Sequence, residues 1–443
     1  MDSTEDFKKK LKNEVFAKVH EYYSKVLSPA SKFVASETRI HYSRRVFDER
    51  ELVNLVDAAL DFWLTLGPYG AKFEAALANF LGANEVVLVN SGSSANLVML
   101  STLLSKRLER QLKPGDEIIT PAVTFPTTLT PIIQNQLKPV FVDCQLETLN
   151  IDPDKLEEAV SDRTKAIFIP HTLGLPCKMD IIMDFVKKHK LFLLEDSCDA
   201  LGATYDGKTV GTFGDLGSLS FYPAHHITMG EGGAVIINDP EYSRIVRSIR
   251  DWGRDCYCKG DSGVNGACGK RLEYTIEGIP YDHRYVYTHQ GYNLKPTDLQ
   301  AAIGLAQLEK ARSFVEARRN NFNKLKKGLE KYSDKIILPK VEEKANPSPF
   351  AFPLTVKSDS GFTRKDITCF LEKANIETRL IFCGNALRQP AFKNMKCRIA
   401  GELKNSDKIM WDSFFIGVYP GLTEQMVNYV IDRFEEFFDS LST

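Results

Sequence analysis

The chain has 443 residues, of which 43% are hydrophobic and 26% are charged, a composition typical of a folded globular protein. Its formal net charge is −1 and its basic residues are dispersed, so nothing in it indicates nucleic-acid binding. The first ten residues lack the apolar core of a signal peptide, and no apolar run approaches the roughly 18 residues that span a bilayer. We therefore expect a cytoplasmic protein with no membrane partner.

Apolar periodicity predicts the elements of the first half of the chain. Amphipathic patterns predict helices over 6–25, 50–62 and 72–81. Between 85 and 240 short apolar runs alternate with helical patterns, which indicates an α/β fold with a mostly parallel sheet and helices on both faces. The predicted strands are Val86–Val89, Glu117–Thr120, Val140–Val142, Ala166–Ile169 and Leu191–Leu194.

The pattern changes in the last third of the chain, where we expect a smaller α+β unit. A long helix is predicted to begin near Pro296. Beyond residue 335 the expected elements are a strand over 352–356, a helix over 363–374, a strand near 377–382 and a final helix from Thr423. The predicted division is an N-terminal helical segment (1–66), a large α/β domain (67–334) and a small C-terminal α+β domain (335–443).

Polar residues directly after the predicted strands mark a candidate ligand site, because ligands of such sheets bind beyond the carboxyl ends of the strands. Small residues over Asn90–Asn96 begin a helix whose free N–H groups suit a phosphate, although serine and glycine also cap helices without a ligand. Asp196 ends a buried strand, where a carboxylate is costly unless it is paired. Glu195 should face the opposite side, because adjacent strand residues alternate.

The segment Gly217–Gly233 carries the most specific pattern in the chain. Its Ser-Phe-Tyr run at 220–222 and its Gly-Glu-Gly-Gly run at 230–233 resemble the cofactor loop of fold-type I pyridoxal-phosphate (PLP) enzymes. Within that class the chain resembles the DegT/DnrJ/EryC1/StrS sugar aminotransferases. The position of their cofactor-binding lysine is occupied here by His225, and no lysine lies between Lys208 and Lys259.

The resemblance assigns roles to residues at matching positions. Gly92 and Ser93 offer backbone amides to the cofactor phosphate and Ser220 offers a hydroxyl. Phe125 stacks on the pyridine ring, although an aromatic residue after a strand is otherwise usually core. Asp196 pairs with the protonated ring nitrogen, which keeps the ring an electron sink.

Three further residues follow from the same resemblance. Asn293 is expected to reach the phosphate of a neighbouring subunit, which implies a homodimer with shared active sites. Asn385 and Arg388 lie in the segment that resembles the nucleotide-sugar contacts of the family. Arg388 or Arg379 is the candidate partner of the diphosphate, because guanidinium binds phosphate oxygens bidentately, and an ordinary surface arginine is the alternative for each.

A histidine in the lysine position changes the expected chemistry. A lysine amine condenses with the cofactor aldehyde, whereas imidazole cannot form that bond. Imidazole still acts as a general base near neutral pH, since its ordinary pKa is about 6.5. We therefore expect pyridoxamine phosphate (PMP) held without a covalent bond, with His225 as the base. The alternative is a loop histidine in a protein without activity, and the neighbouring His226 is expected to be structural.

Four of the nine cysteines form a pattern. Cys198 follows Asp196, Cys256 and Cys258 are separated by one residue, and Cys268 comes after nine more. Four thiolates suit a [2Fe–2S] cluster or a structural zinc, and unrelated free thiols are the third possibility.

Together, His225 and the cysteine set resemble the CDP-4-keto-6-deoxyglucose-3-dehydrase group of lipopolysaccharide dideoxysugar synthesis. The 57 residues between Cys198 and Cys256 match that group, while the gap before Cys268 is longer. The resemblance implies PMP-dependent loss of the C-3 hydroxyl from a nucleotide-linked 4-keto-6-deoxyhexose. It also implies a [2Fe–2S] cluster fed by an NAD(P)H-dependent reductase that carries flavin and its own iron–sulfur cluster.

Other functions stay open from the sequence. A cluster-free enzyme of the GDP-4-keto-6-deoxymannose type also has a histidine at this position and recharges its cofactor with glutamate. A non-catalytic PLP- or PMP-binding regulator is less compatible with the complete set of cofactor contacts. An ordinary sugar aminotransferase requires the lysine.

Overall fold

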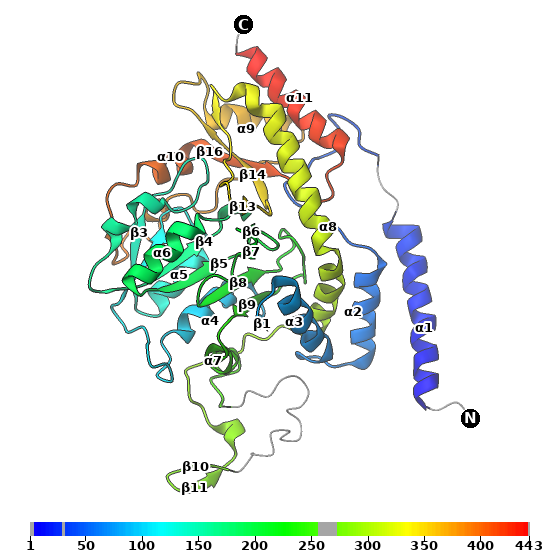
Figure 1. The fold of residues 1–443 in the computed structure, drawn as a ribbon. Helices are drawn as coiled ribbons and strands as arrows, with labels where there is room; N and C mark the ends of the chain where they lie inside the picture. The colour runs from blue at the N-terminus through cyan, green and yellow to red at the C-terminus, as the bar shows by residue number, and fades with distance from the viewer. Residues whose placement is uncertain (1–3, 29–31, 256–272, 442–443) are drawn as a thin grey trace.

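A large sheet forms the centre of the computed structural model, which describes residues 4–28, 32–255 and 273–441 (Figure 1). Eight strands pair in the order β1-β9-β8-β5-β4-β2-β3-β15. Their bounds are β1 Glu85–Val89, β2 Glu117–Pro121, β3 Lys138–Val142, β4 Thr164–Pro170, β5 Phe192–Asp196, β8 Leu216–Ser220, β9 Gly233–Ile237 and β15 Arg398–Ile399. All five strands predicted between residues 85 and 240 are present.

The sheet is mostly parallel, as the alternating pattern predicts. β9 pairs antiparallel with both of its neighbours, β1 and β8, and every other pairing is parallel. Central strands such as β2 and β5 are buried along their whole length. Strands buried on both faces read as continuous apolar runs, which is why they are recognisable in the sequence.

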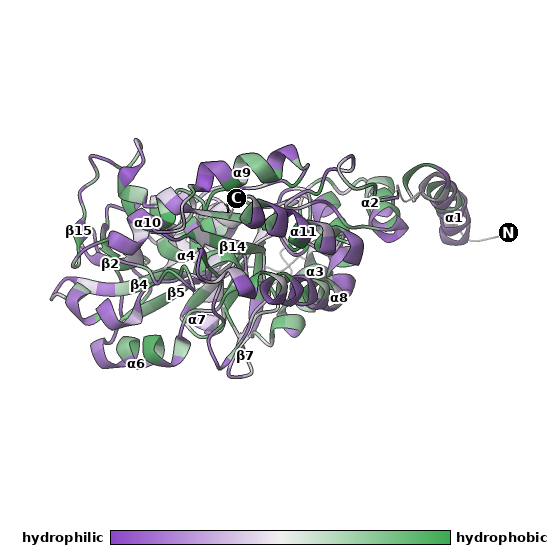
Figure 2. Ribbon diagram, turned by 90° about the horizontal axis from the view of Figure 1, so that it is seen from above, coloured by the Kyte–Doolittle hydropathy of each residue, from purple (hydrophilic) through white to green (hydrophobic). Residues whose placement is uncertain are grey.

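Helices cover both faces of the sheet. On one face α4 (Gly92–Thr102), α5 (Pro126–Gln134) and α7 (Pro240–Arg250) share a buried core with alternate strand residues. On the other face lie α6 (Met179–His189), α3 (Pro68–Leu81) and the first part of α8 (Asp298–Leu329). Figure 2 shows green, hydrophobic stretches on the central strands and purple, hydrophilic stretches along the outer helix α8.

The first two helices of the described chain lie beside each other. α1 (Thr4–Tyr22) continues into a π-helical turn, Tyr23–Leu27, and has no buried residue. It lies beside α2 (Glu49–Asp61), to which Lys12 binds through Asp57 and Asp61 (Figure 1). Both elements agree with the predicted helices over 6–25 and 50–62.

The C-terminal part has a second sheet, of order β12-β14-β16, with its own buried core. The second half of α8 packs into that core, so this helix joins the two sheets. β15 comes from the same part of the chain but extends the large sheet beside β3, and the exact domain boundaries therefore stay a prediction. The elements are β12 Ile336–Ile337, β14 Ala351–Val356, α9 Arg364–Lys373, α10 Lys404–Asp412, β16 Ser413–Gly417 and α11 Glu424–Ser440.

The strand expected over 377–382 is wrong. Only an isolated bridge, from Arg379 to Phe415, forms there, and Ile376 just before it bridges to Ile40. Phe382 adopts a positive φ of 44°, which turns the chain out of an extended course. This segment instead lines the cavity described below.

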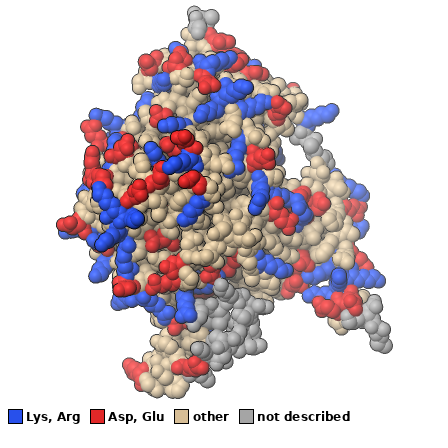
Figure 3. Space-filling view, viewed as in Figure 1, with Lys and Arg blue, Asp and Glu red and all other residues tan. Residues whose placement is uncertain are grey.

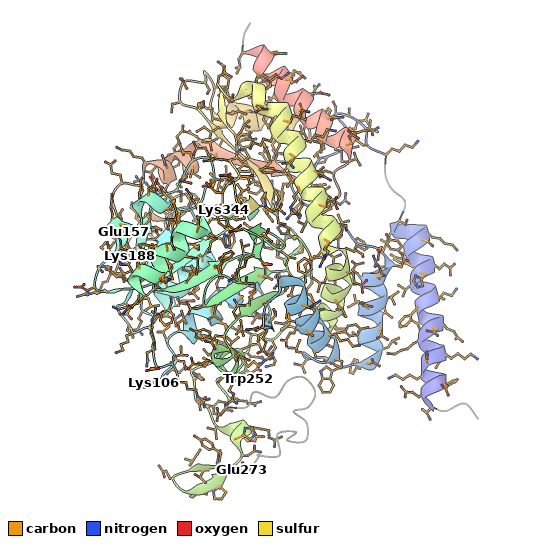
Figure 4. The ribbon with its side chains drawn as sticks, in the orientation of Figure 1. Lys106, Glu157, Lys188, Trp252, Glu273 and Lys344 are labelled. Atoms are coloured by element: carbon orange, nitrogen blue, oxygen red, sulfur yellow. The ribbon has the colours of Figure 1, made fainter. Side chains whose placement is uncertain are left out.

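Small elements complete the fold. The hairpin β10 (Tyr274–Ile276)–β11 (Ile279–Tyr281) projects from the body, on the side where Trp252 lies (Figure 4). A three-stranded sheet joins β6 (Thr204–Tyr205), β7 (Lys208–Thr209) and β13 (Ala345–Asn346). Short 3₁₀ turns lie at Pro153–Lys155, Glu157–Ala159, Thr172–Gly174, His283–Tyr285, Glu330–Tyr332 and Ala386–Arg388.

On the face shown in Figure 3, acidic and basic side chains are interspersed. Among the helices of the described residues, none combines the length and apolarity that crossing a membrane requires.

Candidate active site

A cavity of about 390 Å³ opens at the carboxyl edge of the large sheet. The parallel strands β1, β2, β4, β5 and β8 end there, and β9 begins there because it runs the opposite way. The loop that carries His225 joins β8 to β9 across this edge. Seven of the residues singled out in the sequence for catalysis, cofactor binding or metal binding line the cavity: Gly92, Ser93, Phe125, Asp196, Cys198, Ser220 and His225.

The start of α4 and the end of β8 form a cradle suited to a phosphate. Ser91 caps the helix, its Oγ accepting a hydrogen bond from Ser94 N at 3.1 Å. Gly92 follows as the first helical residue, and a Cβ there would lie 2.6 Å from the Cβ of Ser220. Glycine is therefore required for this close approach, which sets the Ser220 hydroxyl beside a helix N-terminus.

Asp196 presents a buried carboxylate to the same cavity, with 6% of its surface exposed. Its Oδ2 accepts hydrogen bonds from Asn96 Nδ2 and Thr128 Oγ1, both at 2.7 Å. Its Oδ1 accepts one from Cys198 N at 3.2 Å. Ser218 Oγ donates to the Asn96 side-chain oxygen at 2.6 Å and so fixes that amide. The set orients a carboxylate that suits a protonated ring nitrogen.

Glu195 faces the other side of the sheet, as the strand alternation predicts. Its carboxylate accepts hydrogen bonds from the backbone N–H groups of Gly211, Phe213 and Gly214 at 2.7–2.8 Å. The buried ring of His171 contacts it through Nε2 at 3.0 Å. Of these two neighbouring carboxylates, Asp196 therefore faces the cavity and Glu195 stabilises the backbone on the other side of the sheet.

Phe125 is 48% exposed although it sits in the cavity wall. It occupies the N-cap position of α5, and its ring meets Phe382 edge-on at 5.8 Å between centroids. A core residue would be covered by protein on both faces. The exposed ring of Phe125 is instead available for stacking on a planar ligand.

His225 lies at the cavity wall with 16% of its side chain exposed. Its backbone N–H donates to Tyr222 O at 2.9 Å, and its ring contacts the Phe350 ring at 5.4 Å between centroids. Nδ1 is shielded from solvent and lies 3.4 Å from Asp199 Oδ1. The ring nitrogen that remains for a ligand in the cavity is Nε2.

His226 points away from this cavity into the protein. Its Nε2 donates to Ser348 O at 2.9 Å. Burial, and then the nearby Arg318 guanidinium, lowers its pKa well below the ordinary value. The ring is therefore neutral near pH 7, and its role is structural.

The other predicted contacts lie outside the cavity of their own chain. Asn293 is exposed and accepts a hydrogen bond from Lys295 Nζ at 2.9 Å. Asn385 is buried and donates to Asp407 Oδ1 at 2.7 Å, and Arg388 binds the same carboxylate with two N–H groups. Substrate binding by Asn385 and Arg388 therefore stays a prediction that this geometry does not support.

Arg379 is the candidate arginine that does reach the cavity. Its guanidinium lies over the Tyr42 ring at 4.5 Å and also pairs with Glu377. Tyr42 lines the cavity as well. Arg379 is thus better placed than Arg388 to meet a phosphate group of a ligand.

Only one of the four patterned cysteines falls within the described part of the chain. The Cys198 thiol lies beside the phosphate cradle, 3.7 Å from Ser218 Oγ. Burial, and then the Asp196 carboxylate, raises its pKa well above the ordinary value. Cys256, Cys258 and Cys268 lie outside the described residues. Within 4–28, 32–255 and 273–441, no group of three or more His, Cys, Asp or Glu residues is arranged to hold a metal ion.

Several contributors were missed at the sequence level. Asn96 and Thr128 orient Asp196, yet Thr128 lies within a helix with no distinctive pattern. Asp199 follows Asp196 by three residues, and this second acid beyond a strand end was a usable signal. Phe350 comes from a distant segment and carried no signal at all.

The residues present fit a pyridoxal cofactor: a phosphate cradle, a buried carboxylate, an exposed aromatic ring and a shielded histidine converge on one cavity. This site at the carboxyl edge of a mostly parallel sheet defines a PLP-dependent enzyme of the fold-type I, aminotransferase-like class. The chain belongs to the DegT/DnrJ/EryC1/StrS aminotransferase family, whose profile matches residues 46–435.

Two relatives are similar over nearly their whole length. The lipopolysaccharide biosynthesis protein RfbH of Salmonella typhimurium is 50% identical, over 97% of this chain and 98% of its own. The dTDP-4-dehydro-2,6-dideoxy-D-glucose 3-dehydratase of Saccharopolyspora spinosa is 49% identical, over 96% and 92%. A crystal structure of GDP-4-keto-6-deoxymannose-3-dehydratase with a trapped PLP-glutamate geminal diamine superposes with a TM-score of 0.79 at 30% identity, covering 89% of this chain and 99% of that one.

Proposed function

We propose that this chain is a PMP-dependent 3-dehydratase that removes the C-3 hydroxyl of a nucleotide-linked 4-keto-6-deoxyhexose. The observation that carries the proposal is the histidine in the cofactor loop. His225 lies in the cavity wall, and the described cavity lining contains no lysine that could bind the cofactor covalently. Relatives and a structural neighbour named as 3-dehydratases support the same reaction.

The cofactor contacts follow from the cavity. Gly92, Ser93 and Ser220 would hold the phosphate, Phe125 would stack on the ring, and Asp196 would keep the ring nitrogen protonated. When bound, PMP supplies an amine that condenses with the C-4 ketone and a ring that takes up electrons. The buried setting of Asp196 strengthens its interaction with a protonated nitrogen, because the local dielectric is low.

His225 supplies the proton transfer. Nε2 accepts and returns protons at the cavity. The Asp199 carboxylate lies 3.4 Å from Nδ1 without a hydrogen bond to it, and its charge favours a proton on Nδ1, which leaves Nε2 free. A base without a covalent option cannot trap the cofactor as lysine does. It therefore favours loss of the C-3 hydroxyl over completed amino transfer.

Loss of water leaves an unsaturated sugar, which needs two electrons and two protons to become a 3-deoxy sugar. We propose that the cysteine set holds a [2Fe–2S] cluster and that an NAD(P)H-dependent flavin and iron–sulfur reductase supplies the electrons. The cluster would supply one-electron transfer. The spacing of Cys198, Cys256, Cys258 and Cys268 supports this proposal, and CDP-4-keto-6-deoxyglucose is the substrate that the same resemblance favours.

Iron analysis separates this route from the glutamate-dependent one. Anaerobically purified protein is assayed for iron and sulfide and examined by EPR before and after dithionite. About two irons per chain with a reducible signal support the cluster. Absence of iron after reconstitution, together with turnover driven by glutamate, would instead identify the cluster-free reaction that the structural neighbour's bound PLP-glutamate suggests.

We further propose a homodimer in which Asn293 serves the neighbouring subunit. Asn293 is exposed and does not line the cavity of its own chain, as expected for a residue that acts across an interface. Light scattering of the purified protein tests the assembly. Mixing inactive Asn293→Asp and His225→Asn chains tests the sharing, because mixed dimers should regain one working site.

A further inference from the structure

Arg318 of α8 is the largest fully buried side chain in the described part of the chain, and 1% of its surface is exposed. Burying a guanidinium is costly unless its N–H groups and its charge are compensated. Burial lowers its pKa to about 9. Its hydrogen bonds go to backbone carbonyls and include no carboxylate: NH1 donates to Phe350 O at 2.9 Å and NH2 donates to His225 O at 3.2 Å.

Two residues next to the His225 ring, Phe350 and Asp199, also interact with Arg318. Phe350, whose carbonyl Arg318 binds, packs its own ring against the imidazole. Asp199, which attracts the guanidinium electrostatically, lies 3.4 Å from His225 Nδ1. One buried cation therefore acts on the main chain of His225, on the ring that packs against it and on the carboxylate beside it.

Charged and titratable groups surround His225 on two sides. On the side away from the cavity, a small space is lined by His225 together with Arg44, Arg45, His226 and Arg318. On the cavity side lie Asp196, Cys198, Asp199, Tyr222, Glu231 and Arg379. Of the cations on the far side, Arg318 is the one that hydrogen-bonds to His225.

We propose that Arg318 is a positioning residue for His225: it holds the histidine main chain and Phe350 so that Nδ1 stays toward Asp199 and Nε2 stays toward the cavity. This inference rests on the proposed function, in which Nε2 moves the proton. It assigns a task to a buried charge that does not line the cavity.

The matched control is the next residue, Arg319. Its Nε donates to Pro347 O at 2.6 Å and its NH2 donates to Gly202 O at 3.1 Å, so it binds the same neighbourhood without touching His225. Arg318→Met removes the guanidinium, Arg318→Lys keeps a charge with fewer donors, and Arg319→Met reports general loosening.

Two readouts are measured on each variant. Steady-state kinetics with PMP and a nucleotide-linked keto-sugar gives kcat and KM. ¹⁵N NMR of histidine-labelled protein, with the His225 signals identified by their loss in His225→Asn, gives the tautomer of the ring. A misplaced catalytic group costs about 100-fold in rate. Arg318→Met should therefore lower kcat about 100-fold with KM little changed and should convert His225 to a mixture of tautomers.

The outcomes separate the two proposals. Positioning is supported if kcat and the His225 tautomer recover partly in Arg318→Lys and keep their wild-type values in Arg319→Met. Wild-type kcat and tautomer in Arg318→Met overturn it, as does an equal effect of Arg319→Met. If Arg318→Met does not fold, an unchanged tautomer and kcat in Arg318→Lys overturn it. If wild-type protein dehydrates no keto-sugar while the tautomer still changes only in the Arg318 variants, the proposed function fails and the positioning role stands.

Discussion

Replacing Asp196 by Asn tests the electrostatic core of the site. The substitution keeps the shape but removes the charge and one acceptor. The introduced side-chain amide should aim its oxygen at Asn96 and Thr128, whose bonds at 2.7 Å are the shorter ones. Its NH₂ group then faces the backbone N–H of Cys198, which loses its acceptor.

The expected magnitude follows from these contacts. An unpaired buried donor costs about 1–3 kcal/mol of folding free energy. Losing the charge-assisted bond to the ring nitrogen costs about 1.5–3 kcal/mol of cofactor binding, which corresponds to a Kd about 10- to 140-fold higher. Turnover should fall further, because an unprotonated ring is a poorer electron sink.

PMP titration monitored by protein fluorescence measures the change in Kd, and thermal melting measures the change in stability. Asp143→Asn is the matched control, because Asp143 is also buried and accepts bonds from Ser406 and Asn405 outside the cavity. The control should lose stability but keep its affinity for PMP. An Asp196→Asn protein with wild-type affinity and turnover would refute the pairing with the ring nitrogen.

Three further changes test other parts of the site. The His225→Lys protein should form a covalent bond to PLP, which borohydride reduction makes permanent and mass spectrometry detects. Wild-type protein treated in the same way should gain no such mass. A wild-type protein that does gain it would contradict non-covalent cofactor binding. Gly92→Ala places a Cβ 2.6 Å from the Cβ of Ser220, so overpacking of about 1–3 kcal/mol should raise the Kd for PMP about 5- to 140-fold. An unchanged PMP titration would show that the phosphate cradle is elsewhere. Burial and Arg318 hold the folded-state pKa of His226 below its unfolded value of about 6.5, so the unfolded chain binds the proton more tightly. The free energy of unfolding therefore falls as the pH drops below about 6.5. His226→Gln should flatten that decline in urea melts between about pH 7 and pH 5, and an unchanged slope would assign it to other groups.

Most of the fold was predictable because buried parallel strands are continuous apolar runs. Val86–Val89 and Ala166–Ile169 stand out in the sequence for this reason. The segment over 377–382 is apolar only over Leu380–Phe382, and its backbone turn at Phe382 and the bridge from Arg379 to Phe415 are set by tertiary contacts. Local propensity does not encode such contacts.

The candidate site was predictable only where one short segment carries several contacts. Asp196 and Ser220 end strands, and His225 lies in a loop with a recognisable pattern, so their placement at one sheet edge follows from parallel topology. Phe350 and Arg318 reach the same place from distant segments. Residues brought together only by packing leave no local signature.

The fate of the C-3 oxygen tests the central claim most directly. Wild-type protein is incubated anaerobically with PMP and a 4-keto-6-deoxyhexose that is linked to CDP, dTDP or GDP and carries ¹⁸O at C-3. The reductant source is either the reductase with NADH or glutamate. The sugar product is analysed by mass spectrometry. We expect the label to be lost to water with at least one of the three nucleotides, in a reaction that His225→Asn abolishes. A 4-amino sugar that retains the C-3 label would contradict the account and identify an aminotransferase instead.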